Sequence, residues 1–226
     1  MNNVIIACDF SSFNELNLFL KKLGKEKPFL KIGYQLFYKI GREGIRKLKA
    51  RGFKIFLDLK LHDIPNTVYH GVESLKDLKV DMLTIHAAGG IEMMKQAKLA
   101  AGKNIKVLAV TQLTSTDSKT LKNELLINKD INSTILHYAK NANKAKVDGV
   151  ICSPNEVKLI KSKIGKNFLA VTPGIRYSSN AANDQKRIAT PQLAKKYGSD
   201  YIVVGRPITK SDSPQKMYKK ILKEFN

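Results

Sequence analysis

Residues 56–67 read Phe-Leu-Asp-Leu-Lys-Leu-His-Asp-Ile-Pro-Asn-Thr, a pattern typical of a buried β-strand and the turn that leaves it. Side chains alternate between the two faces of a strand, so the aliphatic residues at positions 55, 57, 59 and 61 share one face while Asp58 and Lys60 share the other. A strand that is covered on both faces should be apolar throughout. Because desolvation of a buried ion pair can outweigh its Coulombic gain, the two charges indicate a functional site. A plain salt bridge at the end of the strand is the alternative.

Short apolar runs alternate with longer amphipathic segments on both sides of this strand. The predicted strands are residues 4–8, 29–32, 54–60, 82–86, 106–110, 149–152, 168–171 and 201–204. The predicted helices are residues 13–23, 38–49, 67–75, 91–101, 132–144, 154–160, 190–196 and 215–223. Strands that are each followed by a helix predict an α/β fold, a (β/α)8 TIM barrel, and the length suits a single domain over residues 1–226. An open doubly wound sheet is the alternative, although no Gly-x-Gly-x-x-Gly follows the first strand.

The chain carries a formal net charge of +21, which would attract polyanions in general. Only six of its 40 basic residues are arginine, and the lysines are spread over every predicted helix rather than gathered in one patch. Nucleic-acid binders tend to have clustered basic patches and arginine forks. We therefore expect a solvated lysine-rich surface and no nucleic-acid partner, although a positive field could also attract a small anionic substrate.

The composition also indicates where the protein works. No apolar run approaches the 18 or more residues that a membrane helix requires, and the first residues lack the basic segment of a signal peptide. Cys8 and Cys152 follow short apolar runs without ligand-like spacing, which is typical of buried free thiols in a reducing compartment. We expect a cytoplasmic protein with no membrane partner.

Most of the residues that we note at the carboxyl ends of the predicted strands have polar side chains. In a barrel enzyme these ends meet at one active site, however far apart the residues are in sequence. In chain order they are Asp9, Lys31, Asp58 with Lys60, His86, Thr111, Pro173, and Gly205 with Arg206. Convergence of four charged residues from the first three strands is a second sign of a functional site.

The residues after the last two predicted strands indicate that the site binds a phosphate group. Barrels frequently hold phosphate with the loops after the seventh and eighth strands, and an arginine fork can donate two hydrogen bonds to a phosphate. Gly205 and Arg206 end the eighth strand, and the long connection over residues 172–189 adds Arg176. That connection and the one over residues 111–129 are long enough to be functional lids.

The sequence does not favour a metal site. His62, His70 and His137 have no partners at metal-ligand spacing. Asp58 and Asp63 could hold Mg²⁺, but Lys60 between them supplies a competing cation. His86 could act as a general acid or base, or it could be a hydrogen-bonded structural histidine at the end of a strand.

These motifs resemble the orotidine 5'-phosphate decarboxylase family, in its bacterial branch. The resemblance spans the chain and rests on Asp58-x-Lys60-x-x-Asp63-Ile64-Pro65-Asn66-Thr67, together with Ala7-Cys8-Asp9, Leu30-Lys31-Ile32-Gly33, His86-Ala87-x-Gly89-Gly90, residues 110–115, 172–176 and 184–187, and Val204-Gly205-Arg206. Cys8 departs from the family, where an aliphatic residue is expected. Related barrels, 3-keto-L-gulonate 6-phosphate decarboxylase and hexulose-6-phosphate synthase, share Asp-x-Lys-x-x-Asp, so a metal-dependent sugar-phosphate decarboxylase or aldolase is the alternative.

The resemblance implies decarboxylation of orotidine 5'-phosphate to UMP, the last step of pyrimidine nucleotide synthesis, with no cofactor and no metal. Lys60 would protonate C6 of the pyrimidine after CO2 leaves, within a charge network formed with Lys31, Asp58 and Asp63. The enzyme would be a homodimer in which Asp63 and Thr67 reach the neighbouring site.

The resemblance also implies the residues that bind the substrate. Asp9 and Lys31 would bind the ribose hydroxyls, while Thr114 and Pro173 would contact the pyrimidine. The phosphate would be held by Arg176, Gln185, Gly205 and Arg206.

Overall fold

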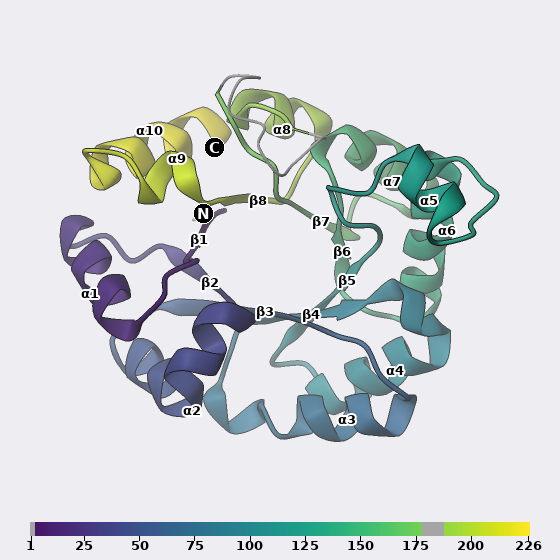
Figure 1. Ribbon diagram of the computed structural model, residues 1–226, viewed down its shortest axis with the longest axis horizontal. Coiled ribbons are helices and arrows are strands. Elements are labelled where there is room, and N and C mark those ends of the chain that lie inside the picture. The colour runs from purple at the N-terminus through teal and green to yellow at the C-terminus, as the bar shows by residue number, and fades with distance from the viewer. Residues whose placement is uncertain (1–2, 178–187) are drawn as a thin grey trace.

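The structure is a computed structural model that describes residues 3–177 and 188–226. Eight parallel strands pair in chain order and close into a barrel with helices around it (Figure 1). The strands are β1 (Val4–Ala7), β2 (Phe29–Gly33), β3 (Lys54–Leu61), β4 (Met82–His86), β5 (Lys106–Val110), β6 (Gly149–Ile151), β7 (Leu169–Thr172) and β8 (Tyr201–Val204). The predicted (β/α)8 TIM barrel is confirmed.

The helices cover the outside of the barrel. They are α1 (Phe13–Lys22), α2 (Tyr34–Ala50), α3 (Pro65–Glu73), α4 (Gly90–Ala101), α5 (Ser118–Asn123), α6 (Ile131–Lys144), α7 (Val157–Ile164), α8 (Pro191–Tyr197), α9 (Arg206–Thr209) and α10 (Pro214–Phe225), with short 3-10 helices η1 (Lys76–Leu78), η2 (Ala87–Gly89) and η3 (Pro154–Glu156). Within the described part of the chain, no helix has the length and apolar character needed to cross a membrane.

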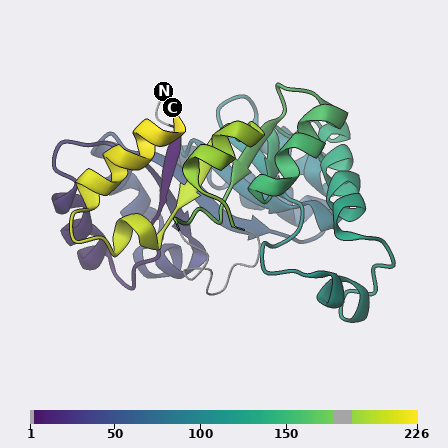
Figure 2. The ribbon, with the colours of Figure 1, turned by 90° about the horizontal axis from the view of Figure 1, so that it is seen from above.

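Two of these helices were not predicted from the sequence. Helix α5 lies in the connection over residues 111–129, and in Figure 2 this connection projects from the barrel. Asp117 caps α5, because its side chain accepts a hydrogen bond from the backbone N–H of Thr120. Helix α9 begins at Arg206, directly after β8. Both helices are too short to show a helical period in the sequence.

The core has two layers, as expected for a closed barrel. Side chains that point outward from the strands pack against the helices, whereas those that point inward fill the barrel. The buried inward-facing residues are Ile5, Ala7, Phe29, Phe56, Met82, Leu108, Val171 and Val203. Lys31 and Asp58 follow Phe29 and Phe56 by two positions, so they stand above this apolar layer at the carboxyl ends of their strands.

The pairing of β3 with β4 is irregular near its carboxyl end. Leu57 pairs with Leu83 and Leu61 pairs with Ile85, so three residues of β3 lie between these pairs but only one residue of β4. One of the three, Lys60, has a φ of 50°, in the left-handed region that non-glycine residues rarely adopt. Such bulges bend a strand and re-aim a side chain beside active sites. The regular alternation assumed from the sequence therefore does not continue unchanged to Lys60.

Three ion pairs repeat at the opposite, amino-terminal end of the barrel. We call them the Asp–Lys clasps. In each clasp an aspartate directly before a strand accepts hydrogen bonds from a lysine of an outer helix and from the backbone N–H of the second residue of the preceding strand. The clasps are Asp81 with Lys49 (2.7 Å) and Ile55 N (2.8 Å), Asp148 with Lys98 (2.7 Å) and Val107 N (2.8 Å), and Asp200 with Lys161 (2.6 Å) and Ala170 N (2.7 Å). Each clasp thus joins one helix to two neighbouring strands.

We expect Asp148→Ala to lower the free energy of unfolding by about 1–3 kcal/mol, because it removes the acceptor of the buried Val107 N–H and leaves Lys98 unpaired. Urea unfolding followed by circular dichroism measures this change. Glu43→Ala is the control, since Glu43 forms only an exposed pair with Lys47 at 3.8 Å, and it should cost less than about 0.5 kcal/mol. Equal costs for the two substitutions would contradict a structural role for the clasp.

Candidate active site

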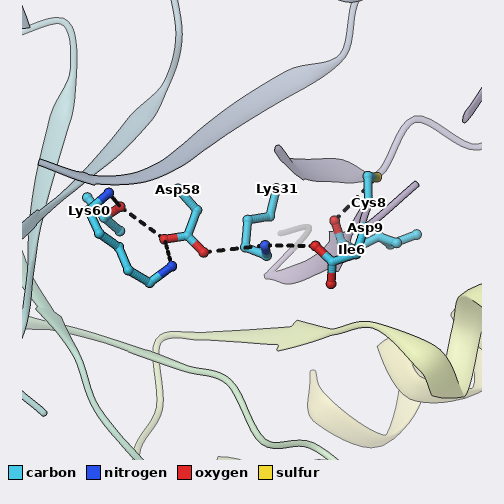
Figure 3. Close-up of polar contacts among 7 residues, drawn as sticks. Ile6, Cys8, Asp9, Lys31, Asp58 and Lys60 are labelled. Carbon is cyan, nitrogen blue, oxygen red and sulfur yellow. Dashed lines mark hydrogen bonds and ion pairs between the residues drawn. The ribbon is translucent and has the colours of Figure 1, made fainter. Parts of the chain in front are cut away.

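Four charged side chains form a row across the carboxyl ends of β1, β2 and β3 (Figure 3). Lys60 Nζ lies 2.9 Å from Asp58 Oδ1, and Lys31 Nζ lies 3.3 Å from Asp58 Oδ2 and 3.3 Å from Asp9 Oδ1. Charges therefore alternate along the row. The structure brings together the four residues that the sequence placed at the ends of the first three strands.

Burial sets the electrostatics of this row. By itself, burial would lower the pKa of the Lys31 ammonium, but the carboxylates of Asp58 and Asp9 outweigh it and raise that pKa above its ordinary value. Burial would likewise raise the pKa of the Asp58 carboxyl. The ammonium groups of Lys31 and Lys60 overcome this cost and hold the Asp58 pKa below its usual range. Both groups are therefore charged at neutral pH.

Gly33 makes room for the row. A Cβ atom at this position would lie 3.3 Å from Lys31 Nζ and 3.8 Å from Asp9 Oδ1, closer to the ammonium than most real contacts. A Cβ atom here would require the Lys31 ammonium to shift by a few tenths of an ångström. The glycine in Leu30-Lys31-Ile32-Gly33 is thus explained by space beside the lysine.

Thr84 belongs to this site and was not predicted from the sequence. Its hydroxyl group donates a hydrogen bond to Asp58 Oδ1 at 3.0 Å and accepts one from the backbone N–H of Lys60 at 2.9 Å. A threonine in a strand is ordinary, so its type gave no signal. The one feature of the sequence that could have indicated its role is its position on the strand that follows the strand of Asp58.

The row forms one wall of a cavity of about 450 Å³. Most of the predicted site residues line it, namely Asp9, Lys31, Asp58, Lys60, Thr114, Pro173, Arg176, Gly205 and Arg206. Further polar lining residues, Gln112, Thr209 and Lys210, had not been predicted. Phe56, Val110, Ile151 and Val203 supply the apolar floor. A compact molecule with an anionic group and an apolar part suits such a cavity.

Arg176 follows β7, which lies four strands around the closed barrel from β3, and it lines the cavity. Its backbone N–H donates to Ala189 O at 2.9 Å, and Ala189 N donates to Gly174 O at 3.1 Å. These bonds hold the two described ends of the β7–α8 connection together. The predicted phosphate ligand Gln185 lies outside the described residues.

Asp63 and Thr67 do not line the cavity of their own chain. Both are exposed, and the Asp63 carboxylate accepts a hydrogen bond from the adjacent Ile64 N–H at 2.7 Å. Two large apolar side chains, one next to Asp63 in the chain and one near Lys60, are exposed. Ile64 is 66% exposed, and Tyr34, whose ring centre lies 5.8 Å from Lys60 Nζ, is 54% exposed.

His86 lies at the end of β4 beside the row but does not line the cavity. Its ring stacks on that of His62 with centroids 5.5 Å apart. Burial is the main reason why the pKa of His86 is lowered, and His62 and Lys60 lower it further. This environment favours the neutral imidazole at neutral pH.

No group of three or more histidine, cysteine, aspartate and glutamate side chains able to hold a metal ion occurs among residues 3–177 and 188–226. The two cysteines, Cys8 and Cys152, are buried free thiols, as predicted. Burial raises the pKa of the Cys8 thiol, so this group is not a nucleophile at neutral pH.

Comparisons with known proteins place this geometry in a family. The sequence model of the orotidine 5'-phosphate decarboxylase / HUMPS family matches residues 2–221. Orotidine 5'-phosphate decarboxylase from Staphylococcus epidermidis is 51% identical over 223 residues, which cover 97% of this chain and 96% of the relative. The enzyme of the same name from Streptococcus gordonii is 48% identical over 223 residues, which cover 98% of this chain and 97% of the relative.

A solved structure supports the same assignment. The crystal structure of orotidine 5'-phosphate decarboxylase from Lactobacillus acidophilus superimposes with a TM-score of 0.90 at 45% identity, and the match covers 100% of both chains. The chain therefore belongs to the orotidine 5'-phosphate decarboxylase / HUMPS family.

Proposed function

We propose that this protein is a carboxy-lyase that converts orotidine 5'-phosphate to UMP, without a cofactor, in a single catalytic domain. The observation that carries the proposal is the alternating row of Lys31, Asp58 and Lys60 above an apolar floor, inside a cavity of about 450 Å³. Family membership supports the reaction, because the similar bacterial relatives bear the name of this activity. The metal-dependent sugar-phosphate reaction is not favoured by these relatives.

Decarboxylation requires a cation close to C6 of the pyrimidine. When the bond between C6 and the carboxylate breaks, CO2 leaves and the electron pair stays on C6, where the pyrimidine ring barely delocalises it. The Lys60 ammonium stabilises this developing charge from a fixed position, with no solvent reorganisation. Lys60 then transfers one proton to C6, which gives UMP, and takes up a proton from solvent before the next turnover.

Asp58 would have two roles in the reaction. It holds the Lys60 ammonium in place through the contact of 2.9 Å. It also lies beside the position of the substrate carboxylate, where like charges repel before the reaction and the repulsion ends when neutral CO2 leaves. This second contribution is smaller than the electrostatic effect of Lys60.

The remaining cavity residues would hold the rest of the nucleotide. Asp9 and Lys31 would bind the ribose hydroxyls, and Thr114 and Pro173 would contact the pyrimidine. The phosphate would lie with Arg176, Gln185, Gly205 and Arg206. Its binding energy acts at a distance from the bond that breaks and can order the site for the reaction.

We further propose a homodimer in which Asp63 and Thr67 complete the neighbouring site. Their exposure outside their own cavity supports this arrangement, since a partner chain can then reach them. The exposed Ile64, next to Asp63, and the exposed Tyr34, near Lys60, would be covered by the partner.

A direct assay tests the proposed reaction. We expect the ultraviolet absorbance of orotidine 5'-phosphate to fall on addition of the protein, at the same rate in excess EDTA as without it. The matched reaction with orotidine, which lacks the phosphate, should be much slower because the phosphate-binding energy is lost. Activity that requires added Mg²⁺, or that occurs only with a sugar phosphate, would instead support the metal-dependent alternative.

A further inference from the structure

We infer that Thr84 is a positioning residue for the proposed reaction, because its hydroxyl group fixes the backbone of Lys60 and the carboxylate of Asp58 relative to each other. This inference rests on the proposed function and assigns a role to a residue that does not line the cavity.

The Thr84 hydroxyl group has one proton, and the contacts determine where it points. The Lys60 backbone N–H can only donate, so the hydroxyl oxygen is its acceptor at 2.9 Å. The Asp58 carboxylate can only accept, so it receives the hydroxyl proton at 3.0 Å. One side chain thus connects the backbone of the proposed proton donor to the side chain that holds its ammonium group.

The irregular pairing of β3 explains why the connection is needed. In a regular parallel ladder the N–H of Lys60 would donate to a carbonyl of the neighbouring strand. Here three residues of β3 stand opposite Thr84 alone, and the N–H meets its hydroxyl group instead. Backbone conformations with φ near 50° cost about 1–3 kcal/mol and persist where the surroundings fix them. The Thr84 hydroxyl group provides that restraint.

Thr84 is completely buried, so water cannot easily replace its hydroxyl group. The charged and titratable groups around Asp58 come from three strands, with Lys31 on β2, Lys60 on β3 and His86 on β4. The hydrogen bond from Thr84 adds to the effect of the two lysines in lowering the pKa of Asp58. Removal of this bond should therefore raise that pKa.

Thr84→Val removes the hydroxyl group at nearly constant volume. We expect kcat to fall roughly ten- to a hundredfold, the factor that corresponds to one lost hydrogen bond to a charged group. The dissociation constant of UMP should change less than about threefold, because the phosphate and pyrimidine contacts remain. The acid limb of the pH profile of kcat should move to higher pH, since Asp58 would accept a proton more readily.

Two further variants separate positioning from folding. Thr84→Ser keeps the hydroxyl group and should restore most of kcat and the position of the acid limb. Thr134→Val removes another buried threonine hydroxyl, which donates within α6 to Asp130 O at 2.9 Å, and should leave kcat unchanged. If Thr84 contributed only to stability, Thr84→Val would have a lower melting temperature but the folded variant would keep its kcat. This result would overturn the inference.

A measurement that needs no turnover separates this inference from the proposed function. Carbon-13 NMR of the Asp58 carboxyl, assigned with Asp58→Asn, should show a higher pKa in Thr84→Val than in the unmodified chain. An unchanged pKa would overturn the inference even where orotidine 5'-phosphate is decarboxylated. The opposite result is a higher Asp58 pKa in Thr84→Val than in the unmodified chain, with no decarboxylation by the unmodified chain. It would support the role of Thr84 in holding Asp58 and overturn the proposed function.

Discussion

Lys60→Ala is expected to lower kcat by roughly 10⁴-fold or more, because it removes both the fixed cation beside C6 and the proposed proton donor. UMP should still bind within about tenfold of the unmodified chain, since the proposed phosphate ligands Arg176 and Arg206 follow β7 and β8, whereas Lys60 lies on β3. Single-turnover kinetics and isothermal titration calorimetry measure the two quantities. The large effect on kcat with a small effect on binding is the pattern of an interaction made mainly in the transition state.

Two control variants sharpen this test. Lys106→Ala removes an exposed lysine at the amino-terminal end of β5 and should leave kcat unchanged. Lys60→Arg keeps a positive charge, but arginine does not give up its proton in proteins, so turnover should stay low if proton donation is required. Near-normal turnover by Lys60→Ala would contradict the role proposed for this lysine.

Asp63→Ala and Lys60→Ala chains are each expected to be inactive alone and to regain activity when they are mixed and allowed to exchange subunits. In a mixed dimer, the Asp63→Ala chain supplies Lys60 to its own site and receives an intact Asp63 from its partner. The other site of that dimer lacks both residues. Random exchange at equal concentrations makes half of the dimers mixed, so roughly a quarter of all sites should be restored.

This result depends on Asp63 acting on the neighbouring site. If Asp63 acted within its own chain, no pairing would restore a complete site and the mixture would stay inactive. A mixture of Lys60→Ala with Asp58→Ala is the matched control, because both residues belong to the same site and no activity should return. Sedimentation of the active mixture measures whether the restored species is a dimer.

The sequence predicted the barrel because eight short apolar runs are each followed by an amphipathic helical segment. It also predicted that Asp9, Lys31, Asp58 and Lys60 would meet, since the carboxyl ends of barrel strands face one mouth. The structure confirms that they form one row. Identification of the residues that touch the neighbouring subunit came from the resemblance, and it remains a prediction.

The strand irregularity could not be predicted, because Leu57, Leu59 and Leu61 fit a regular alternation perfectly well. A bulge leaves no mark on the hydrophobic pattern when aliphatic residues flank it on both sides. Thr84 escaped prediction for a related reason, since its role depends on which residue of β3 stands opposite it, and register is not encoded in either strand alone.

The Asp–Lys clasps have a consequence for how the chain could be rearranged. The start of β1 and the end of α10 lie close together (Figure 2), so a short linker could join the two ends and the chain could be reopened elsewhere. The three clasps span residues 49–81, 98–148 and 161–200 along the chain. New ends placed between these spans would leave every clasp on one continuous piece of chain, whereas new ends inside a span would divide one. Circular permutants should therefore differ in folding efficiency according to this division, independently of their distance from the cavity.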